Sequence, residues 1–250
     1  MKTYKIFIIN LILLCSLGLS AKDYKASLFG VKSDGISLNT RSIQKAVDYI
    51  SENGGGRLVF YVGRYLTGTV ELKSNVTIQL EEGAVLVGVP SIYDYFGLNG
   101  ANALITASGQ ENIGITGKGV IEGQGVALQN NIKEQVQKGY LKGLIAQTSP
   151  LLIYFNNCSN VTIEELNLRD ACGDVQSYKG CKNLTVSKAM IKSKAVAGSK
   201  GLLLTGCDGV KLSDLFFDTS GVEINSAGTS KNVSVVHVKN ASGKKLQVNQ

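Results

Sequence analysis

Aliphatic and polar residues alternate in short runs that recur along the chain. Each run starts with a turn residue and continues aliphatic, polar, aliphatic, and the six runs start at Asn75, Asn112, Asn160, Asn183, Gly209 and Asn232. The last four starts lie 23, 26 and 23 residues apart. Alternation with a period of two places the aliphatic residues on one face of a short strand. A repeat of this length is typical of a solenoid, in which successive coils stack on one another.

A second pair of inward positions follows each of the later runs. It is filled by Leu166 and Leu168, then by Ala189 and Ile191, then by Leu215 and Phe217. The pattern predicts two short strands per coil, separated by a bend, whose inward side chains form one continuous core. Asn suits the start of each run because it tolerates a left-handed backbone. Asn240 takes the last inward position, which predicts that the stack ends there.

A helical pattern precedes the coils. Ile43, Ala46, Val47 and Ile50 share one face of a predicted helix from Asn39 or Thr40 to about Glu52. Such a helix would cover the open end of the core. The fold class predicted is therefore all-β, a single-stranded right-handed parallel β-helix (solenoid) with an N-terminal capping helix, in a domain from residue 22 to 250.

Two segments, about 87–103 and about 124–150, interrupt the repeat as insertions. The first carries Tyr93, Tyr95 and Phe96. The second is basic and has a partly helical pattern in Ile132, Val136, Leu141 and Leu144. Insertions of this kind gather on one face and often line a binding groove, although ordinary packing is the alternative role for these aromatic residues.

Cys158, Cys181 and Cys207 each stand two residues before the start of a run, so they are expected to stack as small buried side chains. A disulfide between adjacent coils is geometrically possible, but free thiols are the expected state because the stack holds an odd number. The spacing does not match a zinc site, and neither a metal nor a cofactor is predicted.

The first residues have the layout of a secretory signal peptide. Lys2 and Lys5 precede an apolar stretch, followed by small residues up to Ala21, so residues 1–21 are predicted to be cleaved. A lipoprotein anchor at Cys15 is a weaker alternative. The prediction is a secreted or periplasmic protein with no membrane span after cleavage. Removal takes two of the 26 basic residues and none of the 19 acidic ones, which leaves a net charge of +5. Such a charge suits an acidic polymer or simply aids solubility. No motif indicates nucleic-acid binding.

Three blocks resemble glycoside hydrolase family 28, the polygalacturonases, within the pectin lyase-like superfamily. They are Phe29-Gly-Val-Lys-Ser-Asp-Gly with residues 43–48, the stretch 54–77, and the stretch 111–125. The resemblance implies hydrolysis of galacturonic-acid linkages by inversion. That reaction needs one carboxylic acid to protonate the leaving oxygen and one carboxylate to activate water.

The residues that do this chemistry in the family are not matched. Its Asn-Thr-Asp-Gly stretch corresponds to residues 198–201, and its Asp-Thr-Gly-Asp-Asp stretch to residues 218–222. Lys200, Gly221 and Val222 therefore stand where the resemblance implies acids, and Asp218 precedes the pair. His237 lacks the flanking glycines of the family's Gly-His-Gly, and no Arg-Ile-Lys follows. The pattern predicts a pseudoenzyme, and catalytic residues are left unknown.

A non-hydrolytic binder of pectin-type or polygalacturonate-type acidic polysaccharide is the leading hypothesis. Lys200, Glu223, His237 and Lys239 are the predicted substrate-binding residues, since a cation in place of an acid would bind a uronate carboxylate. A hydrolase with relocated acids, among Glu223, Asp170 and Asp174, is the first alternative. A structural or vestigial β-helix is the second. A calcium-dependent lyase is disfavoured, because its candidate aspartates are dispersed. The exact polysaccharide and the oligomeric state stay open.

Overall fold

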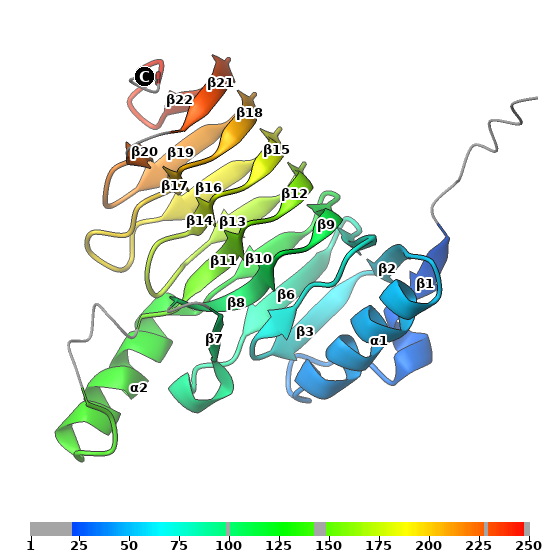
Figure 1. Ribbon diagram of the computed structural model, residues 1–250. Coiled ribbons are helices and arrows are strands. Elements are labelled where there is room, and N and C mark those ends of the chain that lie inside the picture. Colours follow the sequence, from blue (N-terminus) through cyan, green and yellow to red (C-terminus); the bar gives the residue numbers. More distant parts are fainter. Residues whose placement is uncertain (1–21, 99–100, 143–148, 228–229, 248–250) are drawn as a thin grey trace, which may run out of the picture.

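Three parallel β-sheets wound from one chain form the body of the computed structural model (Figure 1), which describes residues 22–98, 101–142, 149–227 and 230–247. Each complete coil contributes one strand to each sheet, and the strands inside the stack pair with the equivalent strands of the coils before and after them. The predicted right-handed parallel β-helix is confirmed. The predicted signal peptide, residues 1–21, lies outside the described residues.

Sheet 1 contains the strands that begin with the repeated runs. Along the stack they are β1 (Asp23–Lys25), β2 (Gly56–Phe60), β5 (Val76–Leu80), β9 (Glu111–Thr116), β12 (Ser159–Glu164), β15 (Lys182–Ser187), β18 (Asp208–Ser213) and β21 (Lys231–Val236). Sheet 2 contains β3 (Gly63–Thr67), β6 (Ala84–Gly88), β10 (Val120–Glu122), β13 (Asn167–Arg169), β16 (Met190–Ser193), β19 (Phe216–Thr219) and β22 (Lys239–Asn240).

Sheet 3 was not predicted, because the repeat indicated only two strands per coil. It contains β4 (Val70–Glu71), β8 (Ala101–Ser108), β11 (Leu151–Asn156), β14 (Gln176–Lys179), β17 (Leu202–Thr205) and β20 (Ile224–Ala227), and the short β7 (Gly97–Leu98) pairs antiparallel with β8. In β14 the inward positions are Gln176 and Tyr178, so the apolar pattern seen at Leu202 and Leu204 of β17 is interrupted in that coil. A third strand turns each coil into a triangle rather than a two-layered sandwich.

The register of the core agrees with the predicted positions. Leu168, Ile191 and Phe217 pair in successive strands of sheet 2, and each is fully buried. Asn240 is the next partner of Phe217, as expected for the end of the stack. Its side-chain oxygen accepts hydrogen bonds from the backbone N–H of Ser242 and of Lys244, and its amide donates to Glu223 Oε1 at 2.7 Å.

The turn residues of sheet 1 adopt the left-handed backbone that the repeat predicted. Asn75, Asn112, Asn160, Asn183 and Asn232 have φ between 52° and 64°, and Gly209 has φ 72°. The amides form a ladder: Asn112 donates to Asn75 at 2.9 Å, Asn160 to Asn112 at 2.9 Å, and Asn183 to Asn160 at 3.1 Å. The ladder is interrupted at Gly209, and Asn232 donates instead to Asp208.

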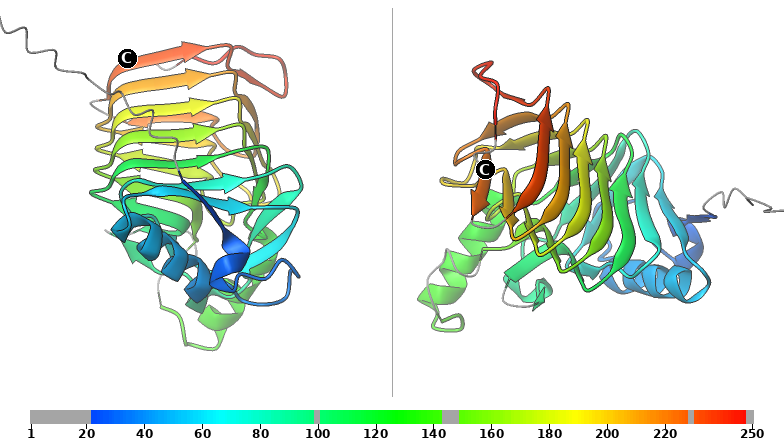
Figure 2. Two further views of the ribbon diagram at one scale, coloured as in Figure 1. Left: turned by 90° about the vertical axis from the view of Figure 1, so that its right-hand side faces the viewer. Right: turned by 45° about the horizontal axis from the view of Figure 1, so that its top comes forward.

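Helix α1 (Thr40–Glu52) lies across the N-terminal end of the stack, at the opposite end from the C-terminus (Figure 2). Its four apolar residues, from Ile43 to Ile50, have no exposed surface and belong to the core. Asn39 occupies the N-cap position, but its side chain makes no capping bond. Instead Asn39 Oδ1 accepts from the N–H of Lys32, and its amide donates to the carbonyl oxygens of Lys32, Ser37 and Leu66. Asn39 therefore stabilises by hydrogen bonds the segment of chain around α1, which includes the 3₁₀ turn η1 (Ala26–Phe29).

Both insertions leave the stack between sheet 2 and sheet 3. The first contains a 3₁₀ turn, η2 (Ile92–Asp94), and the second contains α2 (Gly125–Gln137), with Leu128 and Ile132 buried. They touch each other, since Tyr93 donates to Gln135 Oε1 at 3.0 Å and Ile92 N–H donates to Asn131 Oδ1 at 3.0 Å. Leu144, also predicted to be part of the helical pattern, lies outside the described residues.

The thiols of Cys158, Cys181 and Cys207 stack on consecutive coils, buried and unpaired as disulfides. Each is held by backbone carbonyl groups; Cys207, for example, donates to the carbonyl oxygen of Tyr178 at 3.3 Å. Hydrogen bonds to its two neighbouring thiols, with burial, raise the pKa of Cys181. The thiol column is therefore a packing element of the core.

Candidate functional site

The turns between sheet 2 and sheet 3 form a single face of the molecule, on the left of Figure 1. Lys200 lies in the turn between β16 and β17, and Asp174 lies in the equivalent turn one coil earlier. Next to this face, the outward row of sheet 3 contains Tyr154, which is buried, and Ser177, Leu203 and Asn225, which are partly exposed, one from each successive coil. We call the surface formed by these turns and this row the turn groove.

The register fixes which residues share a position along the turn groove. Gln176, Leu202 and Ile224 pair across three coils, and two residues earlier stand Asp174, Lys200 and Val222. Backbone hydrogen bonds extend the pairing to this position: Val175 N–H donates to Lys200 O at 2.8 Å, and Gly201 N–H donates to Val222 O at 3.0 Å. An acid, a cation and an apolar side chain therefore follow one another at the same point of three coils.

Lys200 and Asp174 face each other across adjacent coils. The ammonium nitrogen of Lys200 lies 3.9 Å from Asp174 Oδ2, at the outer limit of an ion pair, and 39% of the lysine side chain is exposed. The backbone N–H of Lys200 donates to the other carboxylate oxygen at 2.9 Å. Asp174 is thus oriented by the backbone, while the ammonium group of Lys200 keeps free donors for a ligand.

Glu223 does not point into the turn groove. It continues a series of inward positions formed by Val175, which is fully buried, and Gly201, where an added Cβ would lie 2.5 Å from the ring of Phe217. The Oε1 atom of Glu223 accepts a hydrogen bond from the Asn240 amide at 2.7 Å. Glu223 is therefore a polar closure of the core at the last coil. That Glu223 binds substrate stays a prediction, and this orientation of the side chain does not favour it.

Two further aspartates, Asp218 and Asp170, lie near this face. Asp218 forms an ion pair with Lys194, the two atoms being 2.5 Å apart. Asp170 stands at the end of β13 with a left-handed backbone, φ 54°, and its carbonyl oxygen accepts from Gly125 N–H. The side chains of Asp174 and Asp218 each lie against a lysine.

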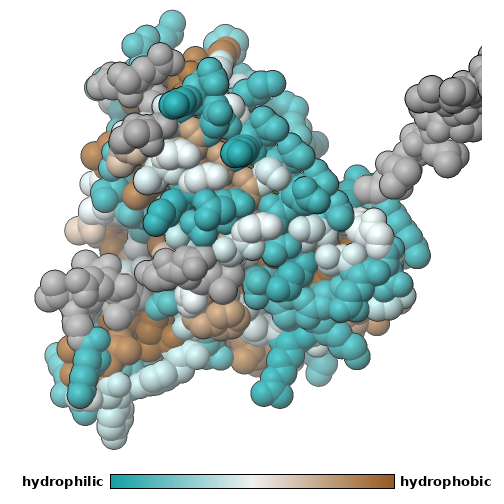
Figure 3. Space-filling view, in the orientation of Figure 1, coloured by the Kyte–Doolittle hydropathy of each residue, from teal (hydrophilic) through white to brown (hydrophobic). Residues whose placement is uncertain are grey.

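Beside the turn groove, the two insertions expose aromatic side chains. Tyr93 and Phe96 are 62% and 50% exposed, and Tyr140, just after α2, is 73% exposed. The surface around α2 is one of the most hydrophobic regions in the space-filling view, at its lower left (Figure 3). The insertions therefore do lie on one face, on the same side of the stack as Lys200 and towards its N-terminal end.

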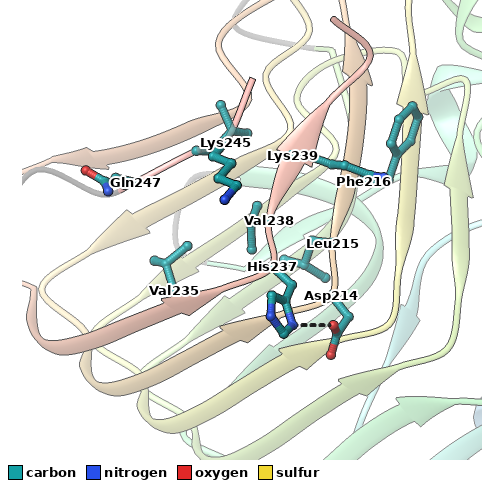
Figure 4. A pocket seen from close by; sticks show the side chains of 10 residues that line it. Asp214, Leu215, Phe216, Val235, His237, Val238, Lys239, Lys245 and Gln247 are labelled. Carbon is teal, nitrogen blue, oxygen red and sulfur yellow. Dashed lines mark hydrogen bonds and ion pairs between the residues drawn. The ribbon is translucent and has the colours of Figure 1, made fainter. Parts of the chain in front are cut away.

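His237 and Lys239 lie elsewhere, around a pocket at the C-terminal end of the stack (Figure 4), which we call the end pocket. His237 occupies the bend between sheets 1 and 2, one coil after Asp214, and both have left-handed φ values, 53° and 54°. His237 Nδ1 lies 3.2 Å from Asp214 Oδ1. The His237 side chain is 80% exposed, Val238 beside it is buried, and Val236 is 46% exposed.

The structure thus divides the four predicted binding residues into two pairs. Lys200 and Glu223 belong to turns between sheets 2 and 3, one outward and one inward. His237 and Lys239 share the end pocket. Two further polar residues of the end pocket, Asp214 and Lys245, were not predicted as binding residues. Asp214 could have been found from the repeat, because it occupies the same bend as His237 one coil earlier.

Comparison with known proteins assigns the scaffold. Residues 60–248 match the family model for the glycosyl hydrolases family 28. The chain belongs to this family. It is 34% identical over 125 residues to an exo-poly-alpha-D-galacturonosidase of Dickeya chrysanthemi, covering 43% of this chain and 20% of that one. It is 30% identical over 177 residues to an endo-polygalacturonase of Pectobacterium parmentieri, covering 64% and 44%.

Another relative of this family 28 chain is named for binding rather than hydrolysis. It is the plasmin and fibronectin-binding protein A of Streptococcus pneumoniae, 28% identical over 182 residues, covering 71% of this chain and 24% of that one. The family 28 chain spans between 20% and 44% of the curated relatives it matches.

Solved structures agree with the family 28 fold. A candidate glycosyl hydrolase from Parabacteroides merdae ATCC 43184 is 51% identical, with a TM-score of 0.86, over 92% of this chain and 100% of that one. A family 28 exopolygalacturonase of Yersinia enterocolitica has a TM-score of 0.78 at 21% identity, over 88% of this chain and 49% of that one, and shows the likeness of fold.

Within the described ranges of this family 28 chain, no three His, Cys, Asp or Glu side chains gather closely enough to hold a metal ion. Over the same ranges, no helix is both long and apolar enough to cross a bilayer.

Proposed function

We propose that this family 28 chain binds an acidic pectin-type polysaccharide along the turn groove and does not hydrolyse it by the family's mechanism. The observation that supports this is that Asp174, Lys200 and Val222 occupy the same position in three successive coils. Lys200 and Val222 stand where the resemblance implies the catalytic acids. An ammonium group there attracts a uronate carboxylate, whereas neither side chain protonates a glycosidic oxygen or activates water.

Relocated acids are a weaker alternative, for a geometric reason. Inverting hydrolysis needs two carboxyl groups facing one another across the sugar, about 6.5–9.5 Å apart. Glu223 is turned inward to Asn240, and Asp218 is paired with Lys194. Asp170 and Asp174 share the turn between β13 and β14, and Asp174 lies against Lys200. An acid beside a cation supports ligand orientation better than acid–base catalysis, and Asp170 is the remaining acid that the hydrolysis assay tests.

The names of relatives support the ligand class. Two relatives are a galacturonosidase and a polygalacturonase, which act on galacturonic-acid polymers, and one is named a binding protein. The predicted net charge of +5 after removal of residues 1–21 attracts such a polyanion. We also propose that the chain is exported to the periplasm or beyond the cell. The mass of the mature protein, beginning after Ala21, would test this.

The binding proposal is tested by electrophoresis through a gel that contains polygalacturonate. The wild-type protein should be retarded, less so in high salt, because exposed charges are screened within about 10 Å at 0.1 M ionic strength. Lys200→Ala should lose most of the retardation. Lys211→Ala is the matched control, because Lys211 is exposed on the outer face of sheet 1 and should leave the retardation unchanged.

The absence of hydrolysis is tested by reducing-end release from the same polymer. No release above the buffer blank is expected from the wild-type protein. Release that Asp174→Asn abolishes would establish a hydrolase with a relocated acid and would refute the proposal. Well-folded protein that neither retards nor releases would leave the β-helix as a structural scaffold without this ligand.

A further inference from the structure

A recess on the outer face of sheet 2, which we call the sheet 2 pocket, shares no lining residue with the turn groove or the end pocket. Its volume is about 280 Å³, just below the range usual for drug-sized ligands, so it suits a smaller molecule. Its lining comes from three adjacent strands in the middle of the stack, β10, β13 and β16. The lining residues are Val120, Asn167, Leu168, Arg169, Met190 and Lys192.

One outward row of sheet 2 forms the walls of the sheet 2 pocket. Val120, Asn167 and Met190 pair in consecutive strands, so their side chains project from the same face. Asn167 is shorter than Met190, and the row therefore dips at β13. Met190 is 38% exposed although it is apolar. Its thioether makes favourable contacts with the edge of an aromatic ring, so the walls suit a flat apolar body.

The polar groups of the sheet 2 pocket have unused hydrogen-bonding capacity. Arg169 and Lys192 pair in the second outward row, beside Asn167 and Met190. Arg169 Nη2 donates to Glu122, but its Nε is buried and has no acceptor among the described residues. Neither the ammonium group of Lys192 nor the amide of Asn167 has a partner within the part of the chain that the structure describes. A ligand with acceptor oxygens gains contacts that these groups otherwise lack.

Positive charge is in excess around the sheet 2 pocket. The carboxylate of Glu122 is shared by two arginines, of which Arg169 is one, so these three groups carry a net charge of +1. Lys192 adds a second positive charge. Its neighbour on the next strand is Asp218, but that carboxylate pairs with Lys194 instead. Two uncompensated positive charges beside apolar walls favour an anion with an apolar body.

We propose that the sheet 2 pocket binds a small aromatic carboxylic acid. The ring lies over Asn167, between Val120 and Met190, and the carboxylate lies beside Lys192 and the guanidinium group of Arg169. A sugar acid fits less well, because its hydroxyl groups would lose water against the apolar walls without gaining partners. A small inorganic anion would leave those walls uncovered. This site does not rest on the function proposed for the turn groove.

The test is a titration of the protein with benzoate, followed by ¹H–¹⁵N NMR. Benzyl alcohol has the ring without the charge, and acetate has the charge without the ring. Benzoate should shift the resonances of residues 120–122, 167–169 and 190–192, and each comparison compound should bind at least about tenfold more weakly. Equal binding of acetate would reduce the site to a general anion site, and equal binding of benzyl alcohol would remove the role of the cations. Either result overturns the proposal.

Variants locate the bound acid. Lys192→Ala should weaken benzoate binding about tenfold by removing a charge-assisted contact. Asn167→Leu fills the recess while keeping both cations and should abolish binding. Lys211→Ala, exposed on the outer face of sheet 1, is the matched control and should bind as the wild type does. The spectra of all variants also report whether each one is folded.

The remaining outcomes also decide the proposal. No shift at millimolar benzoate would remove the site, and shifts confined to Ser177, Leu203 and their neighbours would place the acid in the turn groove instead. Lys200→Ala separates the two proposals, because it should reduce retention by the polymer gel while leaving benzoate binding unchanged. A loss of benzoate binding in Lys200→Ala would overturn the assignment to sheet 2.

Discussion

The two ends of the stack cover the hydrophobic core in different ways. A solenoid leaves the last coil at each end without a neighbour, so its core must be covered. At the N-terminal end α1 places four fully buried side chains over the core. At the C-terminal end a short returning segment covers the core in part, and Val233 and Val235 stay half-exposed.

A single asparagine anchors the covering segment at each end. Asn39 is 2% exposed and bonds four backbone groups on three segments. Asn240 is more exposed and bonds its own turn and Glu223. Within the described residues, fully buried side chains of α1 close the N-terminal end, whereas the C-terminal end carries the end pocket, which Lys239 and Lys245 line.

The largest effect is expected from truncation of the helical cap. Ile50→Ala removes a fully buried side chain of α1 and should lower the free energy of unfolding by about 2–5 kcal/mol, the usual cost of such a cavity. Val235→Ala at the open end should cost less than about 1 kcal/mol, because its side chain is already partly in water. Urea unfolding followed by circular dichroism measures both. Equal losses would contradict the difference between the ends.

The two anchoring asparagines should differ in the same direction. Asn39→Ala leaves several buried backbone groups without partners and should cost about 1–3 kcal/mol. Asn240→Ala should cost less, because water reaches its partners, but it should release residues 241–247. Hydrogen exchange of those amides reports the release. Asn130→Ala, exposed on α2, is the control and should change neither stability nor exchange.

An ion network midway between the ends predicts a pH dependence. Glu122 accepts hydrogen bonds from Arg64 and Arg169 on the outer face of sheet 2. Burial raises the pKa of Glu122, but these hydrogen bonds outweigh that effect and leave the pKa lowered. A lowered pKa stabilises the fold fully above the unfolded value of about 4.3, and the contribution is lost as pH falls through the folded value.

Glu122→Gln should therefore cost about 1–2 kcal/mol at pH 7, since half-exposed pairs contribute less than buried ones. The difference between wild type and variant should shrink below pH 4. Unfolding midpoints measured from pH 3 to pH 7 provide the test, and a difference that is constant over this range would refute the assignment.

The smallest effect should come from completing the asparagine ladder near the open end. Gly209→Asn places an amide between Asn183 and Asn232 at φ 72°, a conformation that Asn tolerates, and should stabilise the protein by about 0.5 kcal/mol. Gly209→Ala is the matched control. It should destabilise, because its Cβ would lie 3.1 Å from Asn183 Oδ1 and gain no hydrogen bond. A melting temperature lower for Asn than for Ala would contradict the ladder.

The repeat predicted sheets 1 and 2 because their inward positions are mostly aliphatic, as at Val161, Leu184 and Val210 of sheet 1. Sheet 3 was missed because a buried glutamine and tyrosine, Gln176 and Tyr178, occupy inward positions and satisfy one another by a hydrogen bond of 2.7 Å. A polar pair of this kind looks like a surface segment in the sequence.

From the sequence, the candidate site could be predicted only as far as the coil, and the position within it, that each residue occupies. Lys200 could be placed, because its turn follows a repeat with matching neighbours. The direction of Glu223 could not, because Gly201 has no side chain to mark that position as inward. His237 and Lys239 were predicted to bind the same ligand as Lys200, but the coil repeat does not show which bend of the triangle a residue occupies.

Because each strand pairs only with strands about one coil away, contacts form between residues close in the sequence. A chain that becomes available N-terminus first is therefore expected to add each coil to the one before it, starting from α1 and the early coils.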